Sequence, residues 1–240
     1  MPDGGPCRVI LLGMMGSGKT TLGTALARRT GWPYHDNDAL LARSTGRTAR
    51  ELALESTHAL RDAEAATLRL AMREPEPAIV AAAAGVVLDR SLRAELPRAG
   101  IVVWLHAPPA VLADRAERGP HRPWLDGDAA AWIAEASVER EPLYRQVAEL
   151  DVDTHAEEPE AAVSRLVAAL ARLGCARWLG TGAEANTSAG IPRAGTFASG
   201  TGEPLPGRHS RGPDIHARDA PDPAVAGVLR YRGVLEVADD

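Results

Sequence analysis

Apolar runs of strand length alternate with longer amphipathic stretches over most of the chain. The runs are continuously apolar, which is typical of strands buried on both faces of a sheet. Between them apolar residues recur at helical spacing, as at Leu22, Ala25 and Leu26, before a glycine at position 31 that fits a helix C-cap. The pattern predicts strands over residues 8–12, 79–82, 101–105 and 150–154 and a second strand ending near Asp36. It predicts helices up to Gly31 and over 39–70 (broken near Gly46), 109–117, 129–144 and 157–173.

Strands that alternate with helices imply βαβ units and an α/β fold, with a mainly parallel sheet covered on both faces. The alternation stops near Leu173, so we expect residues 1–173 to form one domain. Residues 174–240 are rich in Gly, Pro, Ser, Thr and Ala and have no periodicity. We expect a disordered C-terminal extension there, although "VAGVLRYRGVLEV" near its end has the composition of a strand or a short helix.

Composition narrows the class of protein. The 240 residues are 45% hydrophobic and carry a net charge of −5 with a pI near 5.8, which argues against a nucleic-acid binder. The apolar stretch at residues 9–12 is too short to span a membrane. Cys7 and Cys175 lie far apart without metal-type spacing, which favours reduced thiols and a cytoplasmic protein. No predicted helix has a second apolar face, so we expect a monomer.

A phosphate-binding motif follows the first predicted strand. "GMMGSGKT", from Gly13 to Thr20, fits G-x-x-x-x-G-K-[ST] between a strand and a helix. Backbone N–H groups of such a loop and the positive end of its helix surround a β-phosphate. Lys19 is the only lysine in a chain that otherwise uses arginine for every cation, which points to chemistry that a guanidinium cannot replace. Its ammonium would reach the β- and γ-oxygens, and the Thr20 hydroxyl would ligate Mg²⁺.

The nucleotide is expected to be ATP. A GTPase would carry a guanine-reading N-K-x-D motif, and the single lysine is already used in the phosphate-binding loop. The motif predicts nucleotide binding but does not identify what receives the phosphate.

Two carboxylates follow the second predicted strand. Asp36 and Asp38 are two residues apart, and on an extended segment their side chains would point the same way. One would then help to hold Mg²⁺ while the other accepts a proton from an acceptor hydroxyl. The alternative for either residue is an Asx turn or an N-cap before the following helix.

Here the residues resemble the shikimate kinase family. The likeness starts with "GMMGSGKTTLG…LARRTGWPYHDNDALLARSTGR" and continues through "LRDAE" (60–64), "HRPWL" (121–125), "REPLYRQVA" (140–148) and "VDT" (152–154). It covers residues 8–172 with the motifs in order. The resemblance implies a three-layer P-loop kinase sandwich with a five-stranded parallel sheet and a mobile lid. Gluconate kinases and nucleoside monophosphate kinases share only the first of these motifs.

The resemblance also implies roles for individual residues. Asp36 and Thr20 would hold Mg²⁺, and Asp38 would activate the acceptor hydroxyl. Arg61 and Arg140 would bind the substrate carboxylate, with Glu64 orienting Arg61, although in so arginine-rich a chain any single arginine is more often a solvated surface residue. Arg122 on the lid would neutralise charge on the transferring phosphoryl group, and Arg115 and Pro159 would flank the adenine. The nucleotide site would comprise Gly13, Met14, Met15, Gly16, Ser17, Gly18, Lys19, Thr20, Thr21, Arg115, Arg122 and Pro159, with Lys19, Asp38 and Arg122 catalytic.

One segment departs from the family. The family has three consecutive glycines where this chain has Ala83, Ala84 and Gly85, at the wall of the substrate pocket. Glycine serves such a place by allowing positive φ or close approach of a ligand. Two added methyl groups would weaken shikimate binding, reshape the pocket for another polyol, or be absorbed by a small shift. Ala84 and Gly85 remain expected substrate contacts, and His35 and Asn37 are more polar than is usual in the family.

These observations predict an ATP-dependent kinase, with Mg²⁺ as cofactor, that phosphorylates a hydroxyl of shikimate in aromatic amino acid biosynthesis. One alternative is a kinase for a related cyclitol or carboxylated polyol in a specialised pathway. Another is a weakly catalytic nucleotide-binding protein with a regulatory role, against which the retained Lys19, Asp38 and Arg122 count.

Overall fold

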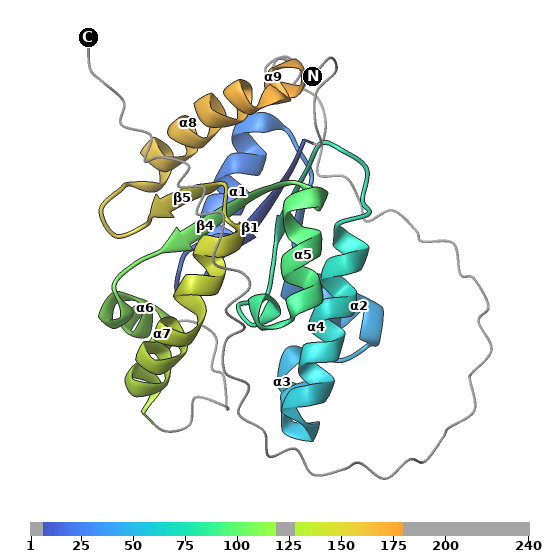
Figure 1. The fold of residues 1–240 in the computed structure, drawn as a ribbon, viewed down its shortest axis with the longest axis vertical. Helices are drawn as coiled ribbons and strands as arrows, with labels where there is room; N and C mark the ends of the chain where they lie inside the picture. The colour runs from blue at the N-terminus through green and yellow to red at the C-terminus, as the bar shows by residue number, and fades with distance from the viewer. Residues whose placement is uncertain (1–6, 119–127, 180–240) are drawn as a thin grey trace, which may run out of the picture. The chain divides into compact units, whose positions relative to one another are not determined.

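The computed structural model describes residues 7–118 and 128–179 (Figure 1), so of the tail predicted at 174–240 all but residues 174–179 lies outside this part. The strands are β1 (Arg8–Leu12), β2 (Tyr34–Asp36), β3 (Ala78–Ala81), β4 (Ile101–His106) and β5 (Leu150–Asp153). The helices are α1 (Lys19–Thr30), α2 (Asn37–Thr45), α3 (Ala49–Glu55), α4 (Thr57–Ala71), α5 (Arg90–Ala99), α6 (Pro109–Glu117), α7 (Ala129–Val147), α8 (Pro159–Leu170) and α9 (Ala176–Leu179). A 3₁₀ turn η1 (Val86–Leu88) follows β3, and a kinked turn η3 (Ala171–Cys175) joins α8 to α9.

The five strands form one parallel sheet in the order β2-β3-β1-β4-β5. β1 lies at the centre, with Ile10 opposite Val80 of β3 and Val102 of β4. The chain therefore moves outward from β1 in both directions, and such reversals of strand order place a binding crevice beyond the carboxyl ends of the strands. The predicted five-stranded α/β fold is confirmed.

Two hydrophobic cores lie on the two faces of the sheet, because successive side chains of a strand point to opposite faces. Ile10 and Leu12 of β1 belong to one core, which α4, α5, α6 and α7 complete. Val9 and Leu11 belong to the other, which α1 and α8 complete. Figure 1 shows α1, α8 and α9 together on one side of the sheet. The continuous apolar runs thus read correctly as strands covered on both faces.

The end of the ordered domain was predicted too early. The helical chain continues through Leu179, and Trp178 and Leu179 pack against the core that contains Cys7 and Leu26. The indole N–H of Trp32 donates to the Trp178 carbonyl at 3.2 Å. Gly174, with φ 97°, bends the chain rather than ending the fold. Residues 174–179 therefore belong to the same domain as the sheet.

The expectation of reduced thiols was also wrong for this structure. Cys7 and Cys175 form a disulfide across 168 residues of sequence, with Cα atoms 5.6 Å apart and both side chains buried. Spacing along the chain gave no sign of it, because the fold brings the start of β1 beside the end of η3. The disulfide fastens the C-terminal helices to the central strand.

Reduction of this disulfide is expected to lower the melting temperature. Opening so long a loop costs about 3–5 kcal/mol in the chain-entropy account, and about 2–4 °C is lost per kcal/mol in a domain of this size. Calorimetry with and without dithiothreitol measures the shift. A Cys7→Ser, Cys175→Ser double variant is the control, and its melting temperature should not respond to dithiothreitol. Equal melting temperatures for oxidised and reduced wild type would contradict the structural role.

None of the helices within residues 7–118 and 128–179 has the length and apolarity needed to cross a membrane.

Candidate active site

A cavity of about 880 Å³ lies at the carboxyl ends of the central strands, where β1, β2 and β3 run into their following segments. The lining differs from one part of the cavity to another. Residues of the Gly13–Thr20 loop line one part, and charged residues from α2, α4 and α7 line another. The lining includes Met15–Thr21, Asp36–Asp38, Arg61, Glu64, Ala81–Gly85, Arg115, Trp132, Arg140, Thr154, Glu157 and Pro159. The fold therefore brings most of the predicted site residues to one cavity.

The loop from Gly13 to Gly18 connects β1 to α1 as the motif predicts. Gly16 and Gly18 have φ values of 77° and 85°, a left-handed conformation that L side chains rarely adopt, and Gly18 is the N-cap of α1. The Lys19 ammonium donates to the carbonyls of Gly13 and Met14 at 2.8 and 3.0 Å. The loop, the single lysine and the positive end of α1 together form an anion site.

The expectation that Asp36 and Asp38 lie on one extended segment was wrong. β2 ends at Asp36, which is the N-cap of α2, and its Oδ1 accepts from the N–H of Asp38 at 3.0 Å. Asp38 is in the first turn of that helix, so the two side chains do not lie on an extended segment. Asp36 therefore caps α2 and also lines the cavity, which Asp38 lines as well. Asp36 is half-buried, and Asp38 is exposed.

Asp36 is held by three elements at once. Its Oδ2 accepts from the Thr20 hydroxyl at 3.3 Å and from the Tyr34 hydroxyl at 3.0 Å. Burial, and then the negative charge of Asp36, raises the pKa of Tyr34, so Tyr34 remains a donor. Thr20 and Asp36 thus present two hard oxygen ligands beside the phosphate loop. That donor set fits Mg²⁺, which usually takes one or two protein oxygens and completes its shell with phosphate and water.

At the other end of the cavity Arg140 of α7 is 5% exposed. Its guanidinium lies 5.3 Å from the centre of the Trp132 ring, and Nη1 is 3.9 Å from the Met14 sulfur. Among the described residues, its ion-pair partner is the exposed Glu139, whose Oε2 is 3.7 Å from Nε, beyond hydrogen-bond distance. A buried cation that lines a cavity and is only weakly compensated favours an anionic ligand.

Arg61 of α4 lies against the backbone of Gly85. A Cβ at residue 85 would clash with Arg61 Nη1 and would be 3.5 Å from Glu64 Oε2. The φ of Gly85 is −86°, which any residue can adopt, so close approach and not backbone strain explains this glycine. Arg61 and Glu64 therefore lie at the same wall, beside Gly85.

The alanine segment is both core and wall. Ala81 and Ala82 are buried, and the Ala82 N–H still pairs with the Leu11 carbonyl at 3.0 Å. Ala83 and Ala84 are half-buried and line the cavity beside Gly85. The Ala84 carbonyl accepts the Tyr144 hydroxyl at 2.6 Å. In this structure the wall that carries the two methyl groups lies beside Arg61.

Arg115 of α6 lines the cavity beside the phosphate loop. Its guanidinium donates to the Thr154 side chain and carbonyl at 3.0 and 2.8 Å, and to the Gly16 carbonyl at 3.4 Å. Thr154 in turn donates to the His106 carbonyl at 3.1 Å. Arg115 thereby joins the phosphate loop to the β5–α8 segment that carries Pro159.

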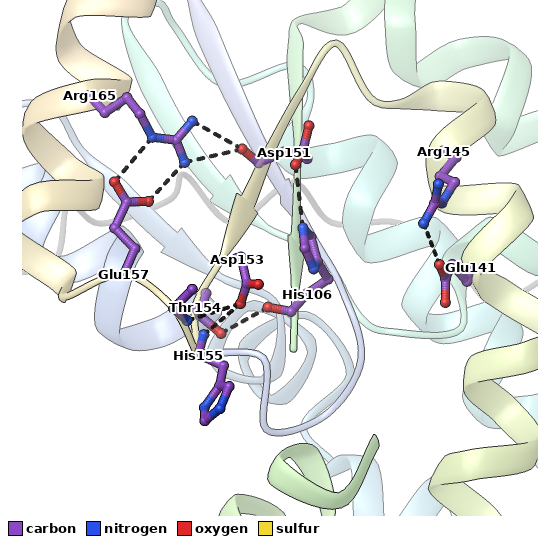
Figure 2. A network of polar contacts seen from close by, with 10 residues as sticks. His106, Glu141, Arg145, Asp151, Asp153, Thr154, His155, Glu157 and Arg165 are labelled. Carbon is purple, nitrogen blue, oxygen red and sulfur yellow. Dashed lines mark hydrogen bonds and ion pairs between the residues drawn. The ribbon is translucent and has the colours of Figure 1, made fainter. Parts of the chain in front are cut away.

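Figure 2 shows the polar contacts that hold this segment. Arg165 of α8 forms a two-pronged pair with Glu157, at 3.1 and 2.8 Å, and reaches the Asp151 carbonyl at 3.3 Å. The His106 ring contacts the Asp151 carboxylate at 3.3 Å, and this hydrogen bond lowers the pKa of Asp151. The loop before Pro159 is therefore fixed to β4, β5 and α8 beside the cavity.

Arg122 and the predicted lid fall at residues 119–127, outside the described part of the chain. Sequence reasoning also missed several lining residues, namely Trp132, Thr154 and Glu157. Thr154 ended a quoted motif, but its partners lie on β4 and α6, which sequence spacing does not bring together. Asn37 is 5% exposed, and its amide has no hydrogen-bond partner within the described residues.

Comparisons with known proteins agree with this geometry. Residues 15–171 match the shikimate kinase family. The chain is 42% identical over 147 residues to a shikimate kinase of Nitratidesulfovibrio vulgaris, covering 59% of this chain and 83% of the relative. A shikimate kinase of Oleidesulfovibrio alaskensis is 40% identical over 171 residues, or 68% of this chain and 98% of the relative.

Solved structures give the same result. The shikimate kinase of Acinetobacter baumannii in complex with shikimate matches with a TM-score of 0.64 and 27% identity, over 70% of this chain and 94% of that one. The shikimate kinase of Bacteroides thetaiotaomicron matches with a TM-score of 0.63 and 29% identity, over 68% and 97%. With its five-stranded parallel sheet, its phosphate loop and its single lysine, the chain belongs to the shikimate kinase family of P-loop phosphotransferases that act on an alcohol acceptor.

Proposed function

We propose that the protein transfers the γ-phosphoryl group of ATP to a hydroxyl of shikimate, giving shikimate 3-phosphate and ADP. The observation that carries the proposal is the placement of two arginines, Arg61 and Arg140, in the same cavity as the phosphate loop and Asp38. Two guanidinium groups suit a carboxylate, which they bind with paired hydrogen bonds. An uncharged sugar or cyclitol gives no reason for a buried arginine there.

The residues divide the work by position. Lys19 and the loop N–H groups hold the β- and γ-phosphates, and Arg115 with Pro159 holds the adenine. Arg61 and Arg140 bind the acceptor carboxylate, with Glu64 beside Arg61, while Ala84 and Gly85 form the wall. Asp38 accepts the proton of the attacking hydroxyl, and Arg122 neutralises charge on the transferring group. Transfer is in-line and direct, so catalysis comes from positioning and charge stabilisation.

Thr20 and Asp36 are the proposed protein ligands of Mg²⁺. Bound there, Mg²⁺ would neutralise negative charge on the phosphates of the nucleotide. Thr20 and Asp36 are already 3.3 Å apart, so the protein part of the site is organised before nucleotide arrives.

A related carboxylated polyol is the second candidate acceptor. Ala83 and Ala84 favour it, because each adds a methyl group to the wall where the family has glycine. A change of that size is worth only about 1–3 kcal/mol in discrimination, which is enough to reorder closely similar acceptors.

Identification of the product tests the proposal. Purified protein, ATP, MgCl₂ and shikimate are incubated, and the mixture is followed by ³¹P and ¹H nuclear magnetic resonance. We expect one phosphomonoester on shikimate for each ADP formed. Release of inorganic phosphate without a phosphorylated acceptor would instead indicate a nucleotide hydrolase, and would overturn the assignment.

We also propose that the enzyme works in the cytoplasm as a monomer. The large exposed apolar side chains of the described residues, Leu54, Leu70 and Val138, are on three different helices. The disulfide runs against this placement, since cytosolic cysteines are ordinarily reduced. The reduction experiment above therefore measures how much stability the protein loses under reducing conditions such as those of the cytoplasm.

A further inference from the structure

Tyr144 is the largest fully buried side chain of the described fold, with 1% of its surface exposed. It is on α7 one turn after Arg140, so the two side chains share a face of the helix. Its hydroxyl does not point to solvent but donates to the Ala84 carbonyl at 2.6 Å. This is a short hydrogen bond between residues 60 positions apart.

The Met14 side chain connects this bond to the phosphate loop. Its sulfur is 3.7 Å from the Tyr144 hydroxyl and 3.9 Å from Arg140 Nη1. Met14 is itself only 4% exposed. One cluster, formed by the buried Met14, Arg140 and Tyr144 and the half-buried Ala84, therefore joins three parts of the site. These are the phosphate loop, the alanine wall and the helix that carries the predicted carboxylate-binding arginine.

The wall needs such a support. Ala82 N–H is the last in this segment to pair with β1, and the next paired N–H is that of Val86, which donates to the Ala83 carbonyl at 3.3 Å. Between them, within the described residues, the N–H groups of 83–85 have no backbone partner. The peptide unit is planar, so fixing the Ala84 carbonyl also fixes the N–H of Gly85 on its opposite side. The Tyr144 hydroxyl thus restrains this peptide directly, by a hydrogen bond to its carbonyl.

We propose that Tyr144 is a positioning residue for the acceptor: by holding the Ala84 carbonyl it sets the Ala84–Gly85 peptide relative to Arg61 and Arg140. The inference rests on the proposed function, because it concerns the same acceptor end of the cavity. Burial raises the pKa of the Tyr144 hydroxyl, which keeps it a donor throughout the working pH range. Its effect should fall on acceptor binding and leave the nucleotide end unchanged.

Tyr144→Phe tests this, because it keeps the ring and removes only the hydroxyl. We expect the KM for shikimate to rise about tenfold, as for the loss of one buried hydrogen bond, while the KM for ATP stays within about twofold. Ser137→Ala is the matched control. Ser137 is a buried hydroxyl on the same helix, and its Oγ has no partner within the described residues. Its removal should leave both constants at the wild-type value.

The outcomes are distinct. A lower melting temperature with an unchanged shikimate KM would mean that Tyr144 only stabilises the core, and would overturn the proposal. Failure of the wild type itself to use shikimate would instead count against the proposed function. Should the Phe variant not fold, wild type labelled with 3-fluorotyrosine serves: shikimate added with ADP should shift the ¹⁹F resonance of Tyr144, and an unmoved resonance would contradict the proposal.

Discussion

Replacement of Lys19 by methionine is expected to lower kcat/KM for ATP by about 10²–10³-fold, the usual cost of removing one preorganised charge from a developing anion. Lys19 donates to the carbonyls of Gly13 and Met14 in this structure, so its ammonium is held at the mouth of the phosphate loop. Methionine has a similar length and no charge. Steady-state rates at saturating acceptor measure the effect.

The charge type is tested separately. Lys19→Arg retains a cation, but the planar guanidinium cannot act as a compact point charge between phosphate oxygens, so we expect it to recover less than about a tenth of the lost activity. Arg28→Met, which removes an exposed cation from the far end of the same helix, is the control and should retain wild-type rates. Near-normal activity of Lys19→Met would contradict the assigned role of the loop.

Replacement of Arg140 by methionine is expected to raise the KM for shikimate by at least about 30-fold. Removing one partner of a buried charge pair costs about 2–5 kcal/mol in comparable complexes. Arg140 is 5% exposed and has no hydrogen-bonded carboxylate among the described residues, so the acceptor would supply its counter-charge. The KM for ATP should stay within about twofold, since Arg115 and the loop are untouched.

The stability of the Arg140→Met variant without ligands should not be reduced, in contrast to its binding of shikimate. Replacing a buried, weakly compensated cation by an apolar side chain is often neutral or stabilising, so the melting temperature without ligands should not fall. Arg145→Met is the matched control, because Arg145 is on the same helix, exposed, and paired with Glu141 at 2.6 Å. A collapse of stability together with an unchanged shikimate KM would make Arg140 a structural residue and remove the main argument for a carboxylated acceptor.

The parts of the site that the sequence predicted well are contiguous. The phosphate loop, its lysine and the strand–loop–helix context lie within twenty residues, so local pattern carries their geometry. Strands β1, β3 and β4 were found for a similar reason, since a strand covered on both faces is mostly apolar, as at residues 101–105. Ala83 and Ala84, which stand where the family has glycines, were also expected at the cavity wall and line it.

The parts that failed depend on contacts between distant residues or on competition at element ends. Asp36 and Asp38 were expected on a strand, but the preference of Asp36 for capping a helix ends β2 between them. Cys7 and Cys175, and Tyr144 and Ala84, meet only through the tertiary fold. The C-terminal boundary of the domain was placed too early because glycine, here Gly174, usually ends a helix. The chain nevertheless packs against the core again at Cys175.

The most direct test of the account is the initial rate of ADP formation by purified wild type with MgCl₂, with and without shikimate. Quinate and a set of uncarboxylated cyclitols are assayed in parallel. We predict a clear shikimate-dependent rate with a KM in the ordinary sub-millimolar range, and little stimulation by acceptors that lack a carboxylate. No stimulation by shikimate in a protein that still binds ATP, or a preference for an uncarboxylated cyclitol, would contradict the account.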